Sequence, residues 1–327
     1  MISVYISGAN GSLETVDVNL LNESFDMKGA WVHLQDPTDR EIGLTSAALG
    51  MPEDFLKAAL DEEERAHIDI DDGNTLLLVD MPIIEDDGDY YNYSTIPLGI
   101  IFNDKYIVTV SLKETVIVDN FTVGRVKSFA THKKTRFVLQ LLYAVATKFL
   151  EYLRKIDKSS QRIQNELYKS MKNKELLQLL ELENSLVYFS TSLKSNDVVI
   201  DRIMRLESLK KYEEDNDLLE DVRSENKQAM EMCSIYRDIL SGTMDAYASV
   251  VSNNLNIVMR TLTAITFVIS IPTLIASIFG MNVKVPWEGE IQGFWIVIAI
   301  CVVSSVVASL FLFHKKKPRR KHPDKLK

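Results

Sequence analysis

The 327-residue sequence predicts an α+β head on long helices, followed by two transmembrane helices near the C-terminal end. Three observations support this fold class. Strand and helix signals alternate from the N-terminus to Thr135, apolar residues spaced by seven follow them, and two long uncharged apolar segments come last. With 46% hydrophobic and 25% charged residues, the chain is neither disordered nor wholly embedded in a membrane.

The head is expected over residues 1–135. Short segments rich in β-branched and aromatic residues, bounded by turn residues, predict strands at Ile2–Ile6, Thr15–Leu20, Trp31–Leu34, Leu76–Ile84, Leu98–Phe102 and Tyr106–Val110. The last two flank a short loop at residues 103–105, which predicts a hairpin. Pro37 and Pro52 each fit the first turn of a helix, where the missing N–H of proline leaves no bond unmade.

A helical repeat replaces the strand signals after Thr135. Apolar residues seven apart continue through residues 136–217 and predict an antiparallel hairpin of two amphipathic helices. The acidic stretch Tyr212–Asp217 is expected to end this hairpin. Residues 218–258 are expected to be the cytoplasmic stalk of one long helix, which would measure roughly 95 Å from Leu218 to Met281.

Two segments are long and apolar enough to cross a membrane, which takes about 20 residues. The first transmembrane helix is expected over residues 259–282 and the second over 294–313, with an outer loop at 283–293 in which Pro286 and Gly289 predict a turn. The alternative is a pair of buried core helices. It is disfavoured because helices of soluble proteins rarely run this long without a charge.

The charged residues predict how the chain lies in the bilayer. Of 37 basic and 46 acidic residues, eight basic and one acidic fall in the tail 314–327, which leaves 29 basic and 45 acidic residues in the rest. A basic tail after the second span places both termini in the cytoplasm, with the protein in the cell (inner) membrane. The N-terminal segment Met1–Asn10 lacks the features of a signal peptide. A body this acidic is a poor partner for nucleic acid.

The first span has a polar stripe. Residues at steps of three or four fall on one side of a helix, and here they are Asn256, Met259, Thr263, Thr266, Ser270, Thr273, Ser277 and Gly280. Two interpretations stay open: close helix packing through small residues, or the lining of a water-filled pore in a symmetric oligomer. No Asp, Glu, Lys, Arg or His lies between Thr261 and Val283 or between Ile291 and Phe313, which argues against a proton relay.

Sequence motifs of enzymes are absent. The patterns GxxxxGK[ST], GxSxG and HExxH do not occur, and no pair of histidines has metal-ligand spacing. Cys233 and Cys301 stand far apart in the sequence, which excludes a CxxC site. The chain is therefore not expected to be an enzyme.

Gly280, Met281 and Asn282 stand where the first span leaves the membrane. Together with two C-terminal spans, a short loop, a basic tail and a large acidic N-terminal region, this triplet resembles the signature of the CorA family of divalent-cation channels. The segments Leu34–Thr38, Tyr236–Gly242 and Ile271–Ala276 also resemble that family. The resemblance covers essentially the whole chain. It implies a CorA-like funnel, in which a homopentamer places five first-span helices around a central pore in the lipid bilayer.

The resemblance also implies roles for single residues. The triplet would be the selectivity filter, in which neutral Asn282 carbonyls bind hydrated Mg²⁺ without stripping its water. Met259 and Leu262 stand where the family has hydrophobic constrictions, and the remaining pore-lining residues would be Asn256, Thr266, Ser270 and Thr273. The outer loop departs from the family pattern at Lys284, and it carries the acidic residues Glu288 and Glu290.

The sequence thus predicts a magnesium channel that admits hydrated Mg²⁺, with Co²⁺ or Ni²⁺ as further cargo, passively down the electrochemical gradient. Cytoplasmic Mg²⁺ would close it by bridging subunits, because divalent ions relieve the repulsion between acidic bodies. By resemblance, the stalk ligand is Asp221, which precedes Asn282 on the long helix, and a neighbouring subunit would supply Asp89 or Asp86; Asp245 is a second stalk candidate.

Two alternatives remain open. One is a zinc or other transition-metal transporter of the same fold, although Met281 favours the magnesium branch over a zinc branch that has Ile or Val there. The other is a membrane-tethered coiled-coil scaffold that conducts no ions.

Overall fold

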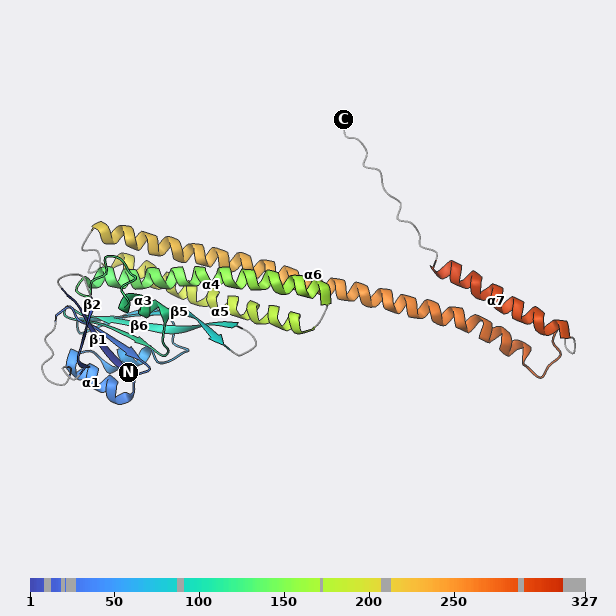
Figure 1. The fold of residues 1–327 in the computed structure, drawn as a ribbon, viewed down its shortest axis with the longest axis horizontal. Helices are drawn as coiled ribbons and strands as arrows, with labels where there is room; N and C mark the ends of the chain where they lie inside the picture. Colours follow the sequence, from blue (N-terminus) through green and yellow to red (C-terminus); the bar gives the residue numbers. More distant parts are fainter. Residues whose placement is uncertain are drawn as a thin grey trace, which may run out of the picture. The chain divides into compact units, whose positions relative to one another are not determined.

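The computed structural model describes residues 1–8, 13–18, 21, 28–86, 91–170, 173–206, 213–287 and 291–313 (Figure 1). The chain divides into two compact units, Met1–Met244 and Asp245–Lys327. The first unit contains the head and most of the helices outside the apolar segments. The second contains both apolar segments.

A mixed seven-stranded sheet forms the centre of the first unit. Its order is β2-β1-β3-β7-β6-β5-β4, and only β3 and β7 pair in parallel. The strands are β1 (Ile2–Ser7), β2 (Leu13–Val16), β3 (Trp31–Gln35), β4 (His67–Asp71), β5 (Asn74–Asp86), β6 (Tyr91–Phe102) and β7 (Ile107–Ser111). The predicted β6–β7 hairpin is confirmed, with Phe102 paired to Ile107. Strand β4 was not predicted.

The two parallel strands are buried on both faces, which explains their nearly continuous apolar sequences. Trp31 of β3 is fully buried among three phenylalanine rings at 5.0–6.4 Å, namely Phe121, Phe129 and Phe137. Its indole N–H donates to the Thr109 hydroxyl of β7 at 2.8 Å, so the ring's one polar group has a partner.

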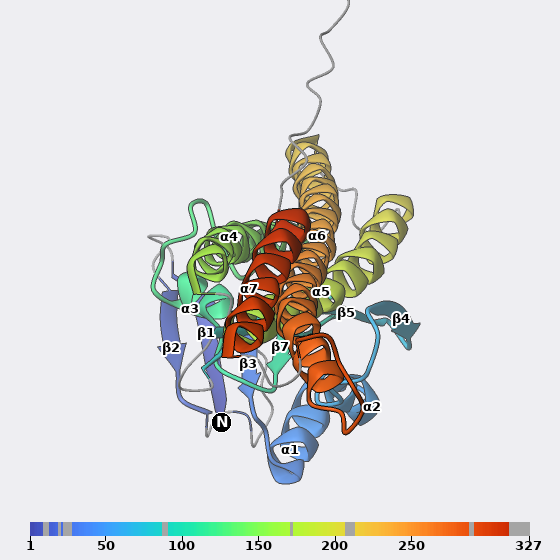
Figure 2. The same cartoon turned by 90° about the vertical axis from the view of Figure 1, so that its right-hand side faces the viewer.

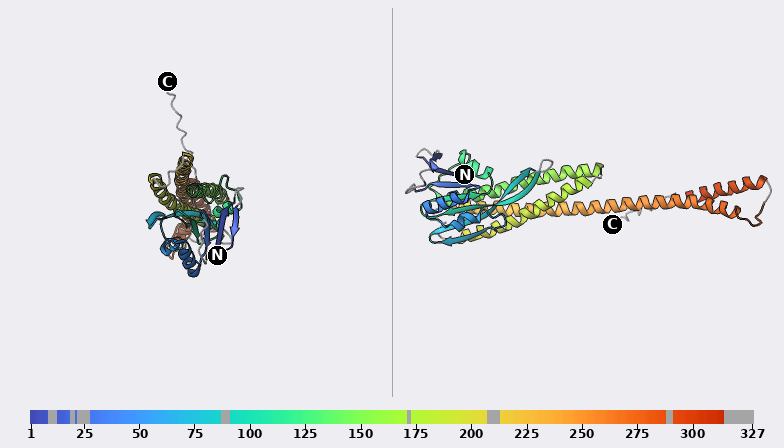
Figure 3. Two further views of the ribbon diagram at one scale, coloured as in Figure 1. Left: turned by 90° about the vertical axis from the view of Figure 1, so that its left-hand side faces the viewer. Right: turned by 90° about the horizontal axis from the view of Figure 1, so that it is seen from below.

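Helices cover the sheet on both sides, as Figures 2 and 3 show. On one side lie α1 (Asp39–Leu49) and α2 (Glu53–Ala58), which close an apolar core with the sheet through Ile42 and Leu56. Helix α1 begins with a capping box between Thr38 and Glu41, two residues later than the Asp-Pro pair that predicted it. On the other side lie α4 (Lys134–Ser170), α5 (Asn173–Arg205) and the first part of α6 (Glu213–Phe279).

The heptad pattern correctly located α4 and α5. Its apolar residues are buried: Leu142, Phe149, Ile156, Leu179, Leu186 and Leu193. A short helix that precedes α4, α3 (Val116–Thr122), was not predicted.

Helix α6 has 67 residues, which corresponds to about 100 Å. It begins at Glu213, so the acidic residues 213–217 form its first turns instead of separating it from α5 as predicted. Acidic side chains are favourable there because the N-terminal end of a helix carries partial positive charge. After α6 the chain turns into α7 (Ile291–Phe313), three residues ahead of its predicted start. Parts of α6 and α7 are long and apolar enough to cross a membrane.

Candidate functional site

The hydroxyl stripe of the first span is exposed on α6, as are apolar side chains beside it such as Phe267, Ile269 and Leu274. Each hydroxyl bonds to the carbonyl four residues earlier on the same helix, at 2.8–2.9 Å: Thr263 to Met259, Thr266 to Leu262, Ser270 to Thr266 and Thr273 to Ile269. The four groups are therefore satisfied without a second helix, which a polar group in a bilayer requires.

A different side of α6 meets α7. Ala264 is buried and Ile275 is half-buried, whereas Ser270 and Thr273 are exposed. On α7 the middle of the half-buried side carries the small residues Cys301, Ser304, Ser305, Ala308 and Ser309, and its ends carry Ile296, Val297 and Leu312. The Cys301 thiol donates to the Pro272 carbonyl with an Sγ–O distance of 3.8 Å. Close packing through small residues thus occurs within this hairpin, but α7 supplies them and the α6 stripe does not take part.

The other predicted pore residues lie on α6 toward its N-terminal end and are exposed as well. Met259 is 54% exposed and Leu262 is 58% exposed, and Asn256 is also exposed. Met259 and Leu262 are exposed in the single subunit. In a membrane protein such large apolar side chains face lipid or contact another subunit.

Helix α6 ends one residue before the Gly-Met-Asn triplet. The Gly280 N–H donates to the Ala276 carbonyl at 2.9 Å, and the Met281 N–H is 3.4 Å from the Ile278 carbonyl. A Cβ on Gly280 would lie 3.3 Å from the Ala276 oxygen, so glycine allows this tight ending. Met281 and Asn282 are exposed beyond the helix end. The structure therefore places the three residues at the end of the hydroxyl stripe.

The predicted regulatory residues are only partly described. Asp221 and Asp245 are exposed on α6, the first in the head unit and the second at the start of the other unit. Asp89 lies outside the described residues, as do Glu288 and Glu290 of the outer loop, and the described part of Asp86 is its backbone at the end of β5. Within the described residues, no group of three or more His, Cys, Asp or Glu side chains could hold a metal ion.

An ion-pair cluster connects the first turn of α6 to α4. Arg136 lies 3.7 Å from the Asp215 carboxylate and 3.5 Å from that of Glu214. Burial raises the pKa of Asp215, although the Arg136 charge opposes that change. This cluster was not predicted, because Arg136 and Asp215 are far apart in the sequence and no local pattern connects them.

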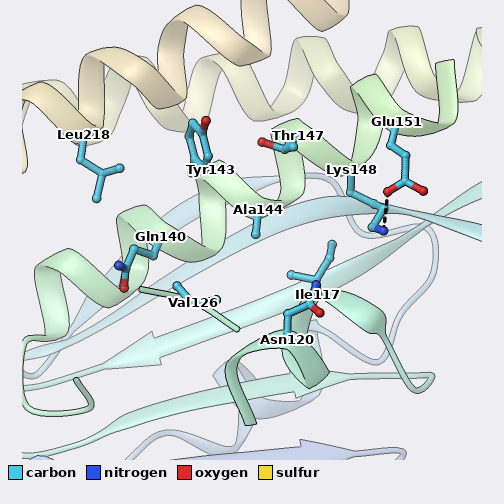
Figure 4. A pocket seen from close by; sticks show the side chains of 10 residues that line it. All are labelled: Ile117, Asn120, Val126, Gln140, Tyr143, Ala144, Thr147, Lys148, Glu151 and Leu218. Atoms are coloured by element: carbon cyan, nitrogen blue, oxygen red, sulfur yellow. Dashed lines mark hydrogen bonds and ion pairs between the residues drawn. The ribbon is translucent and has the colours of Figure 1, made fainter. Parts of the chain in front are cut away.

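The head also contains a cavity of about 430 Å³ between α3, α4 and Leu218 of α6 (Figure 4). Its charged lining is one ion pair, in which the Lys148 ammonium lies 2.7 Å from Glu151. Since the carboxylate is already paired with that cation, the cavity offers no free acidic ligand for a divalent ion, and we assign it no role in transport.

Comparison with known proteins agrees with this arrangement. The family of CorA-like Mg²⁺ transporter proteins matches residues 26–317. A cobalt/magnesium transport protein CorA of Methanocaldococcus jannaschii is 27% identical over 326 residues, which cover 96% of this chain and 99% of that protein. A magnesium transport protein CorA of Campylobacter jejuni is 21% identical over 332 residues, which cover 97% and 99%.

Solved structures share the fold. The complete structure of the CorA magnesium transporter from Methanocaldococcus jannaschii has a TM-score of 0.83 at 22% identity and covers 97% of this chain and 98% of its own. The cytoplasmic domain of ZntB from Vibrio parahaemolyticus has a TM-score of 0.58 at 11% identity over 78% of this chain and 97% of its own. The predicted fold class, an α+β head with a long helix and two C-terminal apolar helices, is thereby confirmed. Because the family match extends from the head through both apolar helices, the chain belongs to the CorA-like Mg²⁺ transporter family.

Proposed function

We propose that this protein is a homopentameric channel that admits hydrated Mg²⁺ across the cell membrane, passively and down its electrochemical gradient. The observation that carries the proposal is the exposed hydroxyl stripe of α6, which ends at Gly280–Asn282 and takes no part in packing on α7. If the stripe served only to pack helices together, we would expect it to contact α7, the apolar helix that follows α6 in the chain. An uncovered polar stripe instead fits the wall of a pore shared by several copies.

The triplet would act as the outer filter. Mg²⁺ gives up its water reluctantly, so a filter that removed all six waters would be slow. Five exposed Asn282 side chains can hydrogen-bond the hydrated ion through neutral carbonyls, and neutral ligands hold it weakly enough to release it. The same side chains would accept hydrated Co²⁺, and the names of the relatives fit both ions.

Met259 and Leu262 would form the inner constriction. Each is more than half exposed within one chain, and a ring of five such side chains would exclude water from a narrow pore. Asn256 stands at the cytoplasmic side of this ring, where its amide would meet the ion as it leaves. The basic tail keeps both termini in the cytoplasm in this arrangement.

Cytoplasmic Mg²⁺ would regulate the channel through Asp221. The Asp221 carboxylate is exposed on α6, which also carries the pore residues, so an ion bound there acts on the pore helix itself. An ion shared with a neighbouring subunit would favour one symmetric packing of the stalks, and its loss would free them. Asp89 and Asp86 remain the candidates for the ligand from the neighbouring subunit, and Asp245 remains a second candidate for the stalk ligand.

The test is Mg²⁺ uptake into proteoliposomes at a fixed inward-negative potential. We expect the parent protein to conduct, Asn282→Ala to lose uptake, and Asn184→Ala, an exposed asparagine on α5, to behave as the parent. All three should assemble equally, because neither side chain is buried. Normal uptake by Asn282→Ala would refute the filter assignment. Uptake of Zn²⁺ but not Mg²⁺ would show a zinc transporter, and uptake of neither ion would show a scaffold.

A further inference from the structure

Two residues outside the triplet make a close backbone contact at the outer end of the hairpin. Trp287 is the last described residue of the loop, and Gly293 is a buried residue in the first turn of α7. A Cβ placed on Gly293 would lie 2.7 Å from the Trp287 carbonyl oxygen and 2.9 Å from the Trp287 Cβ. Both distances are shorter than van der Waals contact permits. The backbone of Trp287 therefore rests directly on Gly293, and only glycine leaves room for it.

The backbone of Trp287 is also in an unusual conformation. Its φ is +64°, in the left-handed region that a large side chain rarely adopts. Such strain persists only where the surrounding structure holds it in place. The contact with Gly293 is one that can do so, because α7 is a regular helix that does not yield easily. The two observations are independent and both indicate that the end of the loop is held against α7.

The loop is short between this contact and the triplet. Asn282 and Trp287 are five residues apart, which span at most about 18 Å. At the other end, the last turn of α6 holds Gly280 through its bond to Ala276. Pro286 stiffens the stretch further, since its ring fixes its own φ and restricts the residue before it. With so few residues between the two positions, a displacement of Trp287 changes the path by which the chain reaches Asn282.

We propose that Gly293 and Trp287 are positioning residues that hold Asn282 in place at the pore mouth. This inference rests on the proposed function, in which the Asn282 amides meet the hydrated ion. Neither residue touches the ion. They fix the height and the rotation of the loop, and a binding group must be held within about 0.5 Å to keep its geometry.

The sequence offered a weak signal for this pair. A glycine stands one residue before Phe294 and Trp295 at the start of the second span, and a tryptophan follows the only proline of the outer loop. Neither feature assigns a contact between them until the close approach of the two backbones is seen.

The test is a concentration series of Mg²⁺ uptake with full-length protein in proteoliposomes. In Gly293→Ala the added methyl group displaces the loop, so the half-saturating Mg²⁺ concentration should rise at least about threefold while the maximal rate changes less. The matched control is Gly43→Ala in α1, whose new methyl group would meet only the Glu53 carboxylate end at 3.8 Å. Both of its transport parameters should equal those of the parent.

A second pair of variants adds no atom that could prevent folding. Trp287→Gly removes the Cβ that lies against Gly293 and gives this position the backbone freedom of glycine, so the loop is less fixed and the half-saturating concentration should also rise. Trp287→Phe keeps the Cβ and the backbone contact, so its half-saturating Mg²⁺ concentration should equal that of the parent. An unchanged half-saturating concentration in both Gly293→Ala and Trp287→Gly, with a conducting parent, would overturn the inference alone. A parent that takes up no Mg²⁺ would overturn the proposed function and this inference with it.

Discussion

Asn196 of α5 hydrogen-bonds both backbone groups of Asp80 on β5. The Asp80 N–H donates to the Asn196 side-chain oxygen at 2.9 Å, and the Asn196 side-chain nitrogen donates to the Asp80 carbonyl at 2.8 Å. The pairing of β4 with β5 ends at Leu78, so Asp80 has no strand on that edge. The amide of Asn196, which is buried, takes the place of the missing peptide group and joins α5 to the sheet.

We expect Asn196→Ala to destabilise the head by about 2–3 kcal/mol, because it leaves a backbone N–H and a carbonyl without partners in a largely buried place. Thermal unfolding of the detergent-solubilised protein measures the loss. Asn184→Ala, on the exposed side of the same helix, should change stability by less than about 0.5 kcal/mol. Equal effects of the two substitutions would contradict the structural role of Asn196.

The side chain of Asp80 makes the stability of the head depend on pH. Burial raises the pKa of this carboxyl from 3.8 to about 6, against the lowering effect of a hydrogen bond with Ser192. The folded state therefore binds the proton more tightly than the unfolded state, so stability falls as the pH rises from 4 through 6.

Asp80→Asn removes the cost of the buried charge and keeps a partner for Ser192. At pH 7.5 the variant should be more stable than the parent by about 2–3 kcal/mol, and the difference should disappear as the pH falls toward 4. Melting temperatures of both proteins across this range provide the measurement. A difference that stays constant with pH would show that Asp80 does not titrate there.

Long, strongly patterned elements could be predicted from the sequence, because a repeated apolar spacing depends on many residues. Helices α4, α5 and α7 are of this kind. The short strands β1, β3 and β7 were located by their β-branched and aromatic residues, whereas the two longest strands, β5 and β6, were predicted only in part. Strand β4 escaped prediction because it alternates isoleucine with acidic residues at the sheet edge, where Ile70 is 51% exposed. Helix α3 has a β-branched sequence that favours a strand; it is a helix because Thr115 caps it and Phe121 is buried beneath it.

The candidate site likewise has parts that the sequence could predict and parts that it could not. The stripe lies on one helix, so its spacing located it, and the triplet directly after that helix was located by its resemblance to a family signature. Their roles in conduction stay predictions. The partner of Asp221 could not be chosen, because it would come from another subunit and no local pattern encodes such a contact. Ser192 and Asn196 were also missed. They interrupt the apolar face of α5, and their partners in the sheet explain why polar residues are buried there: Asn196 bonds the backbone of Asp80 on β5, and Ser192 bonds the hydroxyl of Thr95 on β6.

The pore geometry predicts which positions of α6 meet water. In a background with Cys233 and Cys301 replaced by serine, cysteines at Thr273 and Ser270 should react with small polar thiol reagents while the channel conducts. Both positions are exposed, whereas Ile275 is half-buried on the side toward α7, and its cysteine variant should not react.

Native mass spectrometry of the parent should show a pentamer. Equal reactivity at the three cysteine positions, or a dimer or tetramer by mass, would refute five α6 helices around a pore.

Regulation through Asp221 predicts a specific loss of Mg²⁺ protection. Millimolar Mg²⁺ should protect the stalk of the parent from protease, because bridged subunits hold the stalks together. Asp221→Lys replaces a ligand by a cation and should abolish this protection, whereas Glu231→Lys, an equal charge change at an exposed position of the same helix, should keep it. Protection of both variants, or of neither, would exclude Asp221 as the sensor.

The internal hydrogen bonds of the α6 hydroxyls determine what the stripe presents to water. Since each O–H of Thr263, Thr266, Ser270 and Thr273 is directed at a carbonyl of its own helix, only oxygen lone pairs point outward. The waters around a cation turn their hydrogens outward and find acceptors on such a wall, while the waters around an anion turn their oxygens outward and find no donors. In the proposed pore, an uncharged wall of this kind would discriminate the sign of an ion through the orientation of its hydration shell.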